Sequence, residues 1–276
     1  MRTSLNILKL CFVLLIVSCQ NKTKEAKKTS IDVPTENPVN THSAQDNNDT
    51  FYQYSIWFAF VNKVFDGHLT VKELKAHGDV GLGSFDFLDG ELVMLDGVAY
   101  RIRENGEITT GDDDDQIVYA DAAFFDKDAS FSIDESIRFT DLASKLDEKK
   151  KSPQYFYVYK IHGTFKHIKL GGVPKVEKPF TDGLDVLIPN RPIFETENIS
   201  GTLVGFYCPD YIGHINAKGH HFHFISDDKK WGGHVMEFES SSTLEVQMDQ
   251  KTKYQFDLPS SKAFENVNLS KEFQYN

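Results

Sequence analysis

Cysteine is scarce in this chain, which has three among 276 residues: Cys11, Cys19 and Cys208. The first two lie in an apolar N-terminal segment, so the rest of the chain has no partner cysteines from which to build a disulfide framework. We expect Cys208 to be a small buried apolar residue, because free cysteine is usually buried. The alternative, a nucleophilic thiol, needs an activating neighbour that no local motif supplies.

Basic residues are also few, since 30 Lys and Arg stand against 41 Asp and Glu and the net charge is −11. Residues 51–276 hold 24 basic and 36 acidic side chains. This balance argues against nucleic acid as a partner, because phosphate binding needs a basic face. The acidic run Asp112 to Asp115 is expected to be a solvated loop, since the ligand spacing and closing glutamate of an EF-hand are missing.

Long apolar runs are missing too, except for one near the N-terminus that is too short to span a bilayer as a helix. Residues 1–18 combine a basic start with an apolar run and a small residue, which is typical of a secretory signal peptide. The sequence Ile16-Val17-Ser18-Cys19 resembles a bacterial lipobox, in which the cysteine becomes the lipidated first residue. We therefore expect an exported lipoprotein of the bacterial cell envelope, anchored to a membrane through Cys19. A cleaved signal in which Cys19 has no role is the alternative.

Aromatic residues are absent between residues 20 and 50. A segment with so little to bury cannot offset the entropy lost on ordering, so residues 19–50 are expected to be a lipidated cysteine and a flexible tether. The folded domain is predicted to span 51–276. That length allows one large domain or two subdomains, 51–150 and 151–276.

Short strands separated by turns dominate the predicted domain. Asp89-Gly90 and Asp96-Gly97 are hairpin signals between alternating apolar residues. The second half of the chain is predicted to be mostly strand as well, including the segment LDVLIP at residues 184–189. This pattern predicts an α+β fold of two related sheet-rich subdomains, with mainly antiparallel or mixed strands and few short helices.

Residues 51–67 are predicted to form a strand that runs into a short helix, and two further helices are predicted among these strands. The segment TVKELKAHG has Thr70 and Glu73 at the spacing of a capping box, and it ends at Gly78. The second of these two helices is predicted at residues 140–151, where lysines gather near the C-terminal end and interact favourably with the helix dipole.

Four of the ten histidines lie between residues 220 and 234. Because side chains alternate along a strand, His221 and His223 share one face while His220 points to the other. If the next strand pairs antiparallel, His234 lies close to them, and three imidazoles can bind one zinc ion with a coordination position left open. The alternative is a solvated strand face, and periodicity alone does not choose between the two.

The segment HFHFISDDKKWGGHV resembles the signature of the α-acetolactate decarboxylases, H-x-H-F-I-S-D-D followed by G-G-H. Other motifs of that family follow the same order, at residues 69–97, 173–180 and 201–228. The resemblance implies a mixed α/β architecture, a zinc site and commonly a homodimer. It also implies decarboxylation of 2-acetolactate, or a similar small hydroxy-keto acid, to acetoin and carbon dioxide.

The family's site residues transfer to this sequence in part. Its three zinc ligands fall on His221, His223 and His234, and its active-site glutamate, in the motif L-D-G-E, falls on Glu91. From its position alone, Glu91 is a polar residue at a hairpin end. The resemblance instead implies that it supplies or relays a proton.

One position departs from the family pattern, because Gly171 stands where the family has an arginine that meets the substrate's carboxylate. Loss of such a donor typically costs on the order of a hundred- to a thousand-fold in rate. Lys169 and Lys175 are candidates to replace it, or they are surface residues. Glu272 is the candidate for an acidic C-terminal residue that reaches the zinc in relatives. The alternative function is therefore a catalytically impaired or repurposed zinc-binding protein of the same fold.

Overall fold

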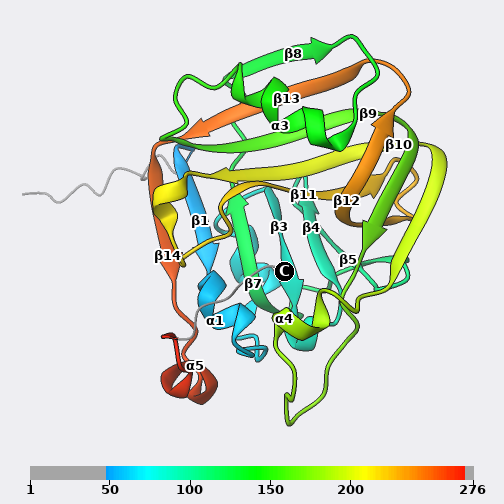
Figure 1. Cartoon of the computed structure of the whole chain (residues 1–276). Coiled ribbons are helices and arrows are strands. Elements are labelled where there is room, and N and C mark those ends of the chain that lie inside the picture. Colours follow the sequence, from blue (N-terminus) through cyan, green and yellow to red (C-terminus); the bar gives the residue numbers. More distant parts are fainter. Residues whose placement is uncertain (1–47, 271–276) are drawn as a thin grey trace, which may run out of the picture. The chain divides into compact units, whose positions relative to one another are not determined.

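The computed structural model describes residues 48–270. The predicted signal peptide, Cys19, the tether up to residue 47 and Glu272 lie outside these residues, so what was predicted for them stays a prediction. Within the described part, no helix is long and apolar enough to cross a membrane. The strands form two sheets and the α-helices have four to nine residues, which confirms the predicted α+β class (Figure 1).

The first sheet contains mostly strands from the N-terminal half of the domain. Its order is β14 (Lys253–Asp257), β1 (Thr50–Tyr54), β7 (Gln116–Ala123), β3 (Val80–Phe85), β4 (Glu91–Leu95), β5 (Val98–Ile102) and β6 (Ile108–Thr110), while β2 (Leu69–Thr70) pairs with β7. These pairs are antiparallel, except that β14 returns from the C-terminal end to lie parallel to β1 (Figure 1). Asp96 and Gly97 both have positive φ and form the turn between β4 and β5, as the hairpin signal predicts.

The second sheet has the order β10 (Ile193–Cys208), β11 (Gly219–Ser226), β12 (Gly232–Ser240), β9 (Phe156–Gly171), β13 (Leu244–Lys251) and β8 (Ala129–Ile133). Strands β9 and β10 have 16 residues each and are rich in aromatic and β-branched side chains, which favour extended backbone. They also pair directly with each other. This pairing closes β9, β10, β11 and β12 into a ring, so the histidine strand β11 has a neighbour on both sides.

The helices are α1 (Trp57–Val61), α2 (Val71–Lys75), α3 (Phe139–Asp147), α4 (Leu184–Leu187) and α5 (Lys262–Asn266), with 3₁₀ turns η1 (Asp86–Leu88) and η2 (Asp210–Ile212). Helix α3 packs Leu142 and Leu146 into the core of the second sheet. The Thr70–Glu73 capping box is present at the start of α2, as predicted. The helix predicted at residues 140–151 is α3, which begins one residue earlier than expected and ends at Asp147.

The prediction of a strand at residues 184–189 is wrong, because this segment forms the short helix α4. A short apolar run does not reveal its secondary structure by periodicity. Here Leu184 packs with Phe58, Phe60 and Val61 of α1 in one apolar cluster. One helical turn brings Leu184 and Ile188 to the same side of the segment, where both line a cavity.

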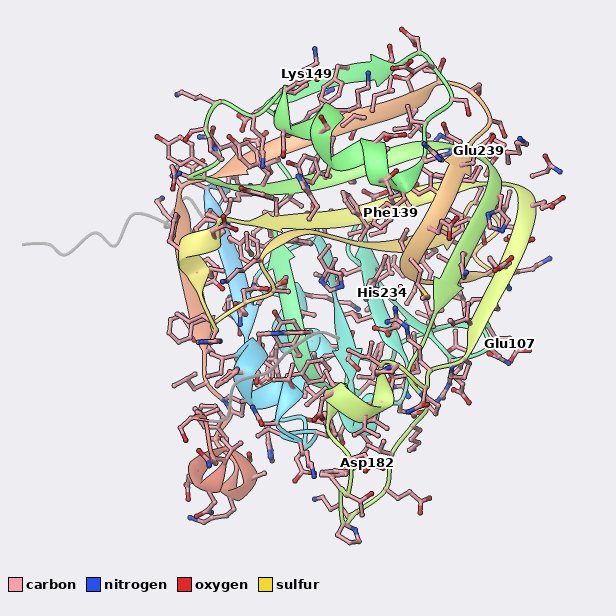
Figure 2. All side chains as sticks on the ribbon, in the orientation of Figure 1. Glu107, Phe139, Lys149, Asp182, His234 and Glu239 are labelled. Carbon is pink, nitrogen blue, oxygen red and sulfur yellow. The ribbon has the colours of Figure 1, made fainter. Side chains whose placement is uncertain are left out.

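The two sheets share an apolar core. It combines side chains of the first sheet with side chains of β10 and β11, among them Leu82, Val93, Ile102, Val204, Phe206 and Ile225. Strand β11 therefore lies against β4. In Figure 2 the labelled His234 lies in the interior, whereas Lys149 and Asp182 lie at the periphery.

Candidate metal centre and cavity

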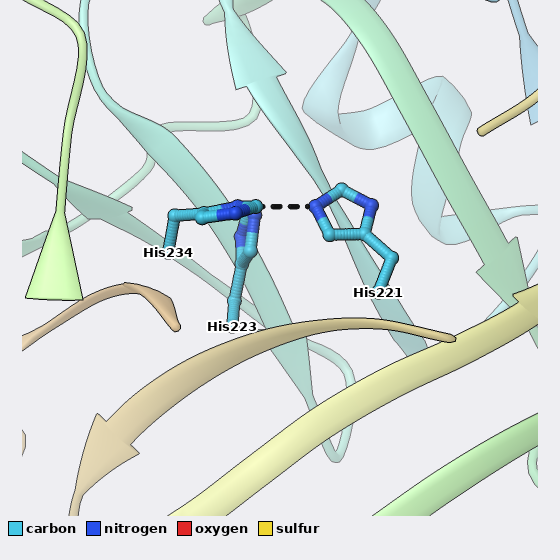
Figure 3. Close-up of side chains that lie close together, drawn as sticks. All are labelled: His221, His223 and His234. Carbon is cyan, nitrogen blue, oxygen red and sulfur yellow. Dashed lines mark hydrogen bonds between the residues drawn. The ribbon is translucent and has the colours of Figure 1, made fainter. Parts of the chain in front are cut away.

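Strand register brings the three predicted histidines together. His221 and His223 lie two residues apart on β11, and His223 is the direct cross-strand partner of His234 on β12. One nitrogen of each ring lies within 4.8 Å of the others (Figure 3). His220 points away from the group, and its Nε2 lies 2.8 Å from Asp147 on α3.

The nitrogens of these rings have the arrangement that a metal requires. His223 Nδ1 donates a hydrogen bond to the carbonyl oxygen of Leu92 at 3.0 Å, which fixes the ring and leaves Nε2 as an electron-pair donor. That Nε2, like Nδ1 of His221, is buried without a hydrogen-bond partner among the described residues. His221 Nε2 and His234 Nδ1 lie 3.2 Å apart. Two nitrogen ligands of a tetrahedral zinc ion are separated by about 3.3 Å, so the spacing fits.

The electrostatics keep the three imidazoles neutral, which is the form that binds a metal. Burial, followed by the positive charge of Arg191, lowers the pKa of His221 to about 4. Burial and the neighbouring histidines hold the pKa values of His223 and His234 well below the usual range. The chain therefore presents three neutral nitrogen donors near pH 7.

Glu91 is the first residue of β4, and the register of β4 carries it into the same site. Its Oε2 lies 3.7 Å from Nε2 of His223. Burial raises the pKa of Glu91 to about 7, against the opposing effects of Arg191 and a hydrogen bond from the backbone N–H of Val173. A carboxyl group with this pKa can both hold and release a proton near neutral pH.

Arg191 also belongs to the site, although it is not among the residues predicted from the sequence. It lies between α4 and β10 and lines the cavity together with Glu91 and the three histidines. Its positive charge influences the pKa of all four residues. No local motif marks this arginine. Only the register of two distant strands could have revealed it, because Gly171 on β9 pairs with Ile193 on β10, two residues after Arg191.

Lys169 and Lys175, the other basic candidates, point elsewhere. The Nζ of Lys169 lies 3.5 Å from a carboxylate oxygen of Glu195, and Lys175 is exposed with its Nζ 3.4 Å from Asp89. Neither lysine lines the cavity. Cys208 is buried and its thiol pKa is raised well above the usual value by burial, so it stays a protonated apolar residue.

The histidines and Glu91 open into a cavity of about 620 Å³. Much of its wall is apolar and comes from α1, α4 and neighbouring segments, namely Trp57, Phe58, Phe60, Leu88, Tyr119, Val173, Leu184 and Ile188. A mainly apolar cavity that also presents several polar groups is typical of a site for a small organic molecule.

The fold and the site together define a sheet-rich α+β protein whose histidine triad, able to hold a metal ion, lies in a small-molecule cavity. The α-acetolactate decarboxylase family model matches residues 51–271. The chain therefore belongs to the α-acetolactate decarboxylase family. The names of its relatives support the assignment of this chain as a carboxy-lyase with a small-molecule substrate.

Individual relatives agree with this assignment. The chain is 36% identical to the α-acetolactate decarboxylase of Methanosarcina mazei over 233 residues, which cover 82% of this chain and 78% of the relative. It is 34% identical to the enzyme of Bacillus licheniformis over 225 residues, which cover 82% of this chain and 88% of the relative. The crystal structure of α-acetolactate decarboxylase from Bacillus subtilis strain 168 superposes with a TM-score of 0.78 at 32% identity, and covers 80% of this chain and 94% of that one.

Proposed function

We propose that the protein is a zinc-dependent lyase that converts 2-acetolactate to acetoin and carbon dioxide. The observation that carries this proposal is the convergence of three neutral imidazoles beside Glu91 in a cavity. Zinc suits an all-imidazole donor set, and three protein ligands leave a position for substrate. When bound there, zinc would act as a Lewis acid toward the oxygen atoms of the substrate.

The reaction requires one proton from the protein. The bond between the carboxylate carbon and C2 of the substrate breaks, carbon dioxide leaves, and the bonding electron pair stays with the four-carbon remainder. That remainder becomes acetoin when it gains a proton. Glu91 is the donor in this proposal, because its carboxyl group lies beside the triad and burial raises its pKa to about 7 in the metal-free chain.

The apolar wall of the cavity has its own part in the reaction. Apolar side chains such as Leu184 and Ile188 limit the access of water to the reacting carbon. A poorly hydrated site strengthens each electrostatic interaction within it. It also favours departure of the carboxylate as neutral carbon dioxide, while the negative charge passes to the four-carbon remainder.

Acetoin formation is the direct test. The purified protein, stripped of metal and reloaded with zinc, is incubated with racemic 2-acetolactate, and acetoin is measured against the spontaneous rate. His223→Gln is expected to abolish both zinc binding and turnover. The control His162→Gln alters an exposed histidine of β9 that contacts Asp227, and it is expected to leave both unchanged.

The alternative of a zinc-binding protein without this reaction rests on Gly171. It predicts stoichiometric zinc together with no acetoin above the spontaneous rate, so the same assay separates the two functions. The volume of the cavity also supports lyase action on related hydroxy-keto acids with larger substituents.

We further propose that the mature protein is exported and membrane-anchored through lipid on Cys19. The motif Ile16-Val17-Ser18-Cys19 supports this proposal. In cells fed a labelled fatty acid, the wild-type protein is expected to carry label and to sediment with membranes, and Cys19→Ser is expected to do neither. Unlabelled wild-type protein would contradict the proposal.

A further inference from the structure

The arrangement of Gly171 and Arg191 bears on how the site holds its substrate. Gly171 is the last residue of β9 and has two cross-strand partners, Ile193 on β10 and His234 on β12. It is buried and lies beside a triad histidine. The Cβ atom of any side chain at position 171 would therefore lie close to the histidine triad.

The space beside Gly171 is filled by Arg191. A Cβ atom added at Gly171 would lie 2.9 Å from Nε and 3.2 Å from Cδ of Arg191, and 3.0 Å from the sulfur of Met236. The chain just before β10 follows β9 closely, and the N–H of Gly172 donates to the carbonyl oxygen of Pro192 at 3.4 Å. The absence of a side chain at 171 therefore gives Arg191 the room to lie beside the triad.

The charges of the site give Arg191 a specific role. The described lining of the cavity has two lysine or arginine side chains, Arg191 and Lys218. Lys218 is exposed, whereas Arg191 is half-buried and acts electrostatically on Glu91 and on each triad histidine. Arg191 is therefore the more buried of the two cations that line the cavity. A planar guanidinium binds a carboxylate through two parallel hydrogen bonds.

We propose that Arg191, from the connection between α4 and β10, binds and orients the carboxylate of the substrate, and that Gly171 is required to leave it room. This inference rests on the proposed function. Leu184 of α4 and Ile188, which follows that helix, line the same cavity, so α4 and the connection after it supply both an apolar wall and the cation. The carboxylate is held on the side of the triad that Gly171 borders.

If Arg191 binds the substrate carboxylate, its loss is expected to change KM and kcat by different amounts. Its partner loses its negative charge as carbon dioxide forms, so the contact is strongest with bound substrate. Removing it is expected to raise KM more than it lowers kcat. A residue that only supports the metal ligands would instead lower kcat and the zinc content together.

Binding measurements on the zinc-loaded full chain test the proposal without turnover. The probes are 2,3-dihydroxy-2-methylbutanoate, which carries the carboxylate but not the ketone, and butane-2,3-diol, which lacks the carboxylate. Affinities are measured by calorimetric titration. Arg191→Gln is expected to weaken the first probe by about 10- to 100-fold, the effect of a lost charge-assisted pair, and to leave the second unchanged. Lys169→Gln removes the same charge from β9 and is expected to change neither affinity.

Three further variants keep the test decisive. Arg191→Lys retains the positive charge but not the paired hydrogen bonds of the guanidinium, and it is expected to bind the carboxylate probe with intermediate affinity. It also provides the readout if Arg191→Gln does not fold. The double variant Gly171→Arg/Arg191→Gln moves the guanidinium to β9 and is expected to recover part of the lost affinity. The single variant Gly171→Arg brings two cations into one space and is expected to bind the carboxylate probe less well than the wild type.

The outcomes separate this inference from the proposed function. Equal affinity of wild type, Arg191→Gln and Arg191→Lys for the carboxylate probe would overturn the role of Arg191, even if acetoin forms. Loss of affinity for both probes together would also overturn it, because the residue would then support the cavity in general. Selective loss for the carboxylate probe supports the role, even if no acetoin forms and the proposed reaction fails.

Discussion

Nε2 of His223 lies 3.7 Å from Oε2 of Glu91, and this contact joins β11 of the second sheet to β4 of the first. The carbonyl of Leu92, next to Glu91, also accepts the hydrogen bond that orients the His223 ring. The proposed proton donor and a candidate metal ligand are therefore positioned by the same pair of adjacent segments. The site depends on how the two sheets pack, and each sheet alone would hold only part of it.

Glu91→Gln is expected to lower kcat by about 10²- to 10⁴-fold while zinc content and fold are retained, because the amide keeps the shape of the side chain but cannot transfer the proton. Initial rates of acetoin formation and metal analysis of the same preparation check this. Glu245→Gln, at an exposed position of β13, is the matched control with unchanged rate expected. A Glu91→Gln variant with full activity would remove Glu91 from the reaction.

Asp121 makes the stability of the fold depend on pH. It is buried on β7 and accepts a hydrogen bond from Nδ2 of Asn216 at 2.8 Å, and burial raises its pKa from 3.8 to about 8. The folded protein thus binds this proton more tightly than the unfolded chain. The resulting stability is complete below about pH 4 and is lost as the pH rises through about 8.

Asp121→Asn, which has no proton to lose, is expected to flatten this dependence. Urea unfolding of the metal-free protein at several pH values measures it, with exposed Asp185→Asn as the control. A wild-type free energy of unfolding that does not decrease relative to Asp121→Asn over this pH range would contradict the assignment.

Thr70→Ala is expected to lower the free energy of unfolding by about 0.5–2 kcal/mol, because it removes one half of the capping box at the start of α2. Chemical unfolding at fixed pH measures the change. Thr109→Ala, at an exposed position of β6, is the comparison and is expected to have a smaller effect. Turnover should stay near the wild-type value, since α2 does not line the cavity.

The cavity has a volume of about 620 Å³, so a slightly larger substrate is expected to react almost as well as acetolactate. The analogue of acetolactate with an ethyl group in place of the C2 methyl should therefore be converted with kcat/KM within about tenfold of acetolactate, since one added methylene is worth roughly 0.8 kcal/mol. Leu184→Trp narrows the cavity and should reduce conversion of the larger analogue more. Equal losses for both substrates would contradict a role of this wall in selecting size.

Local physical chemistry made several features of this fold predictable from the sequence. The capping box at Thr70 and the Asp96-Gly97 turn depend on residues within a few positions of each other, and both form as expected. The face shared by His221 and His223 follows from the two-residue period of a strand. The position of His234 required only that neighbouring strands pair antiparallel, which they do.

Features that depend on distant segments could not be predicted in this way. Helix α4 was predicted as a strand because only its packing against α1 shows which conformation its short apolar run adopts. Arg191 was missed because its place in the site follows from the register of β9 with β10. The return of β14 to the first sheet is likewise a tertiary pairing that no local pattern indicates.

The measurement that tests the central claim most directly is the zinc content of the purified protein. Elemental analysis of the wild type and of His221→Gln, His223→Gln and His234→Gln, each reloaded with zinc and dialysed, should find one zinc per wild-type chain and far less in every variant. The exposed-histidine control His162→Gln should match the wild type. Wild-type protein without stoichiometric metal, or triad variants that retain it in full, would contradict the account.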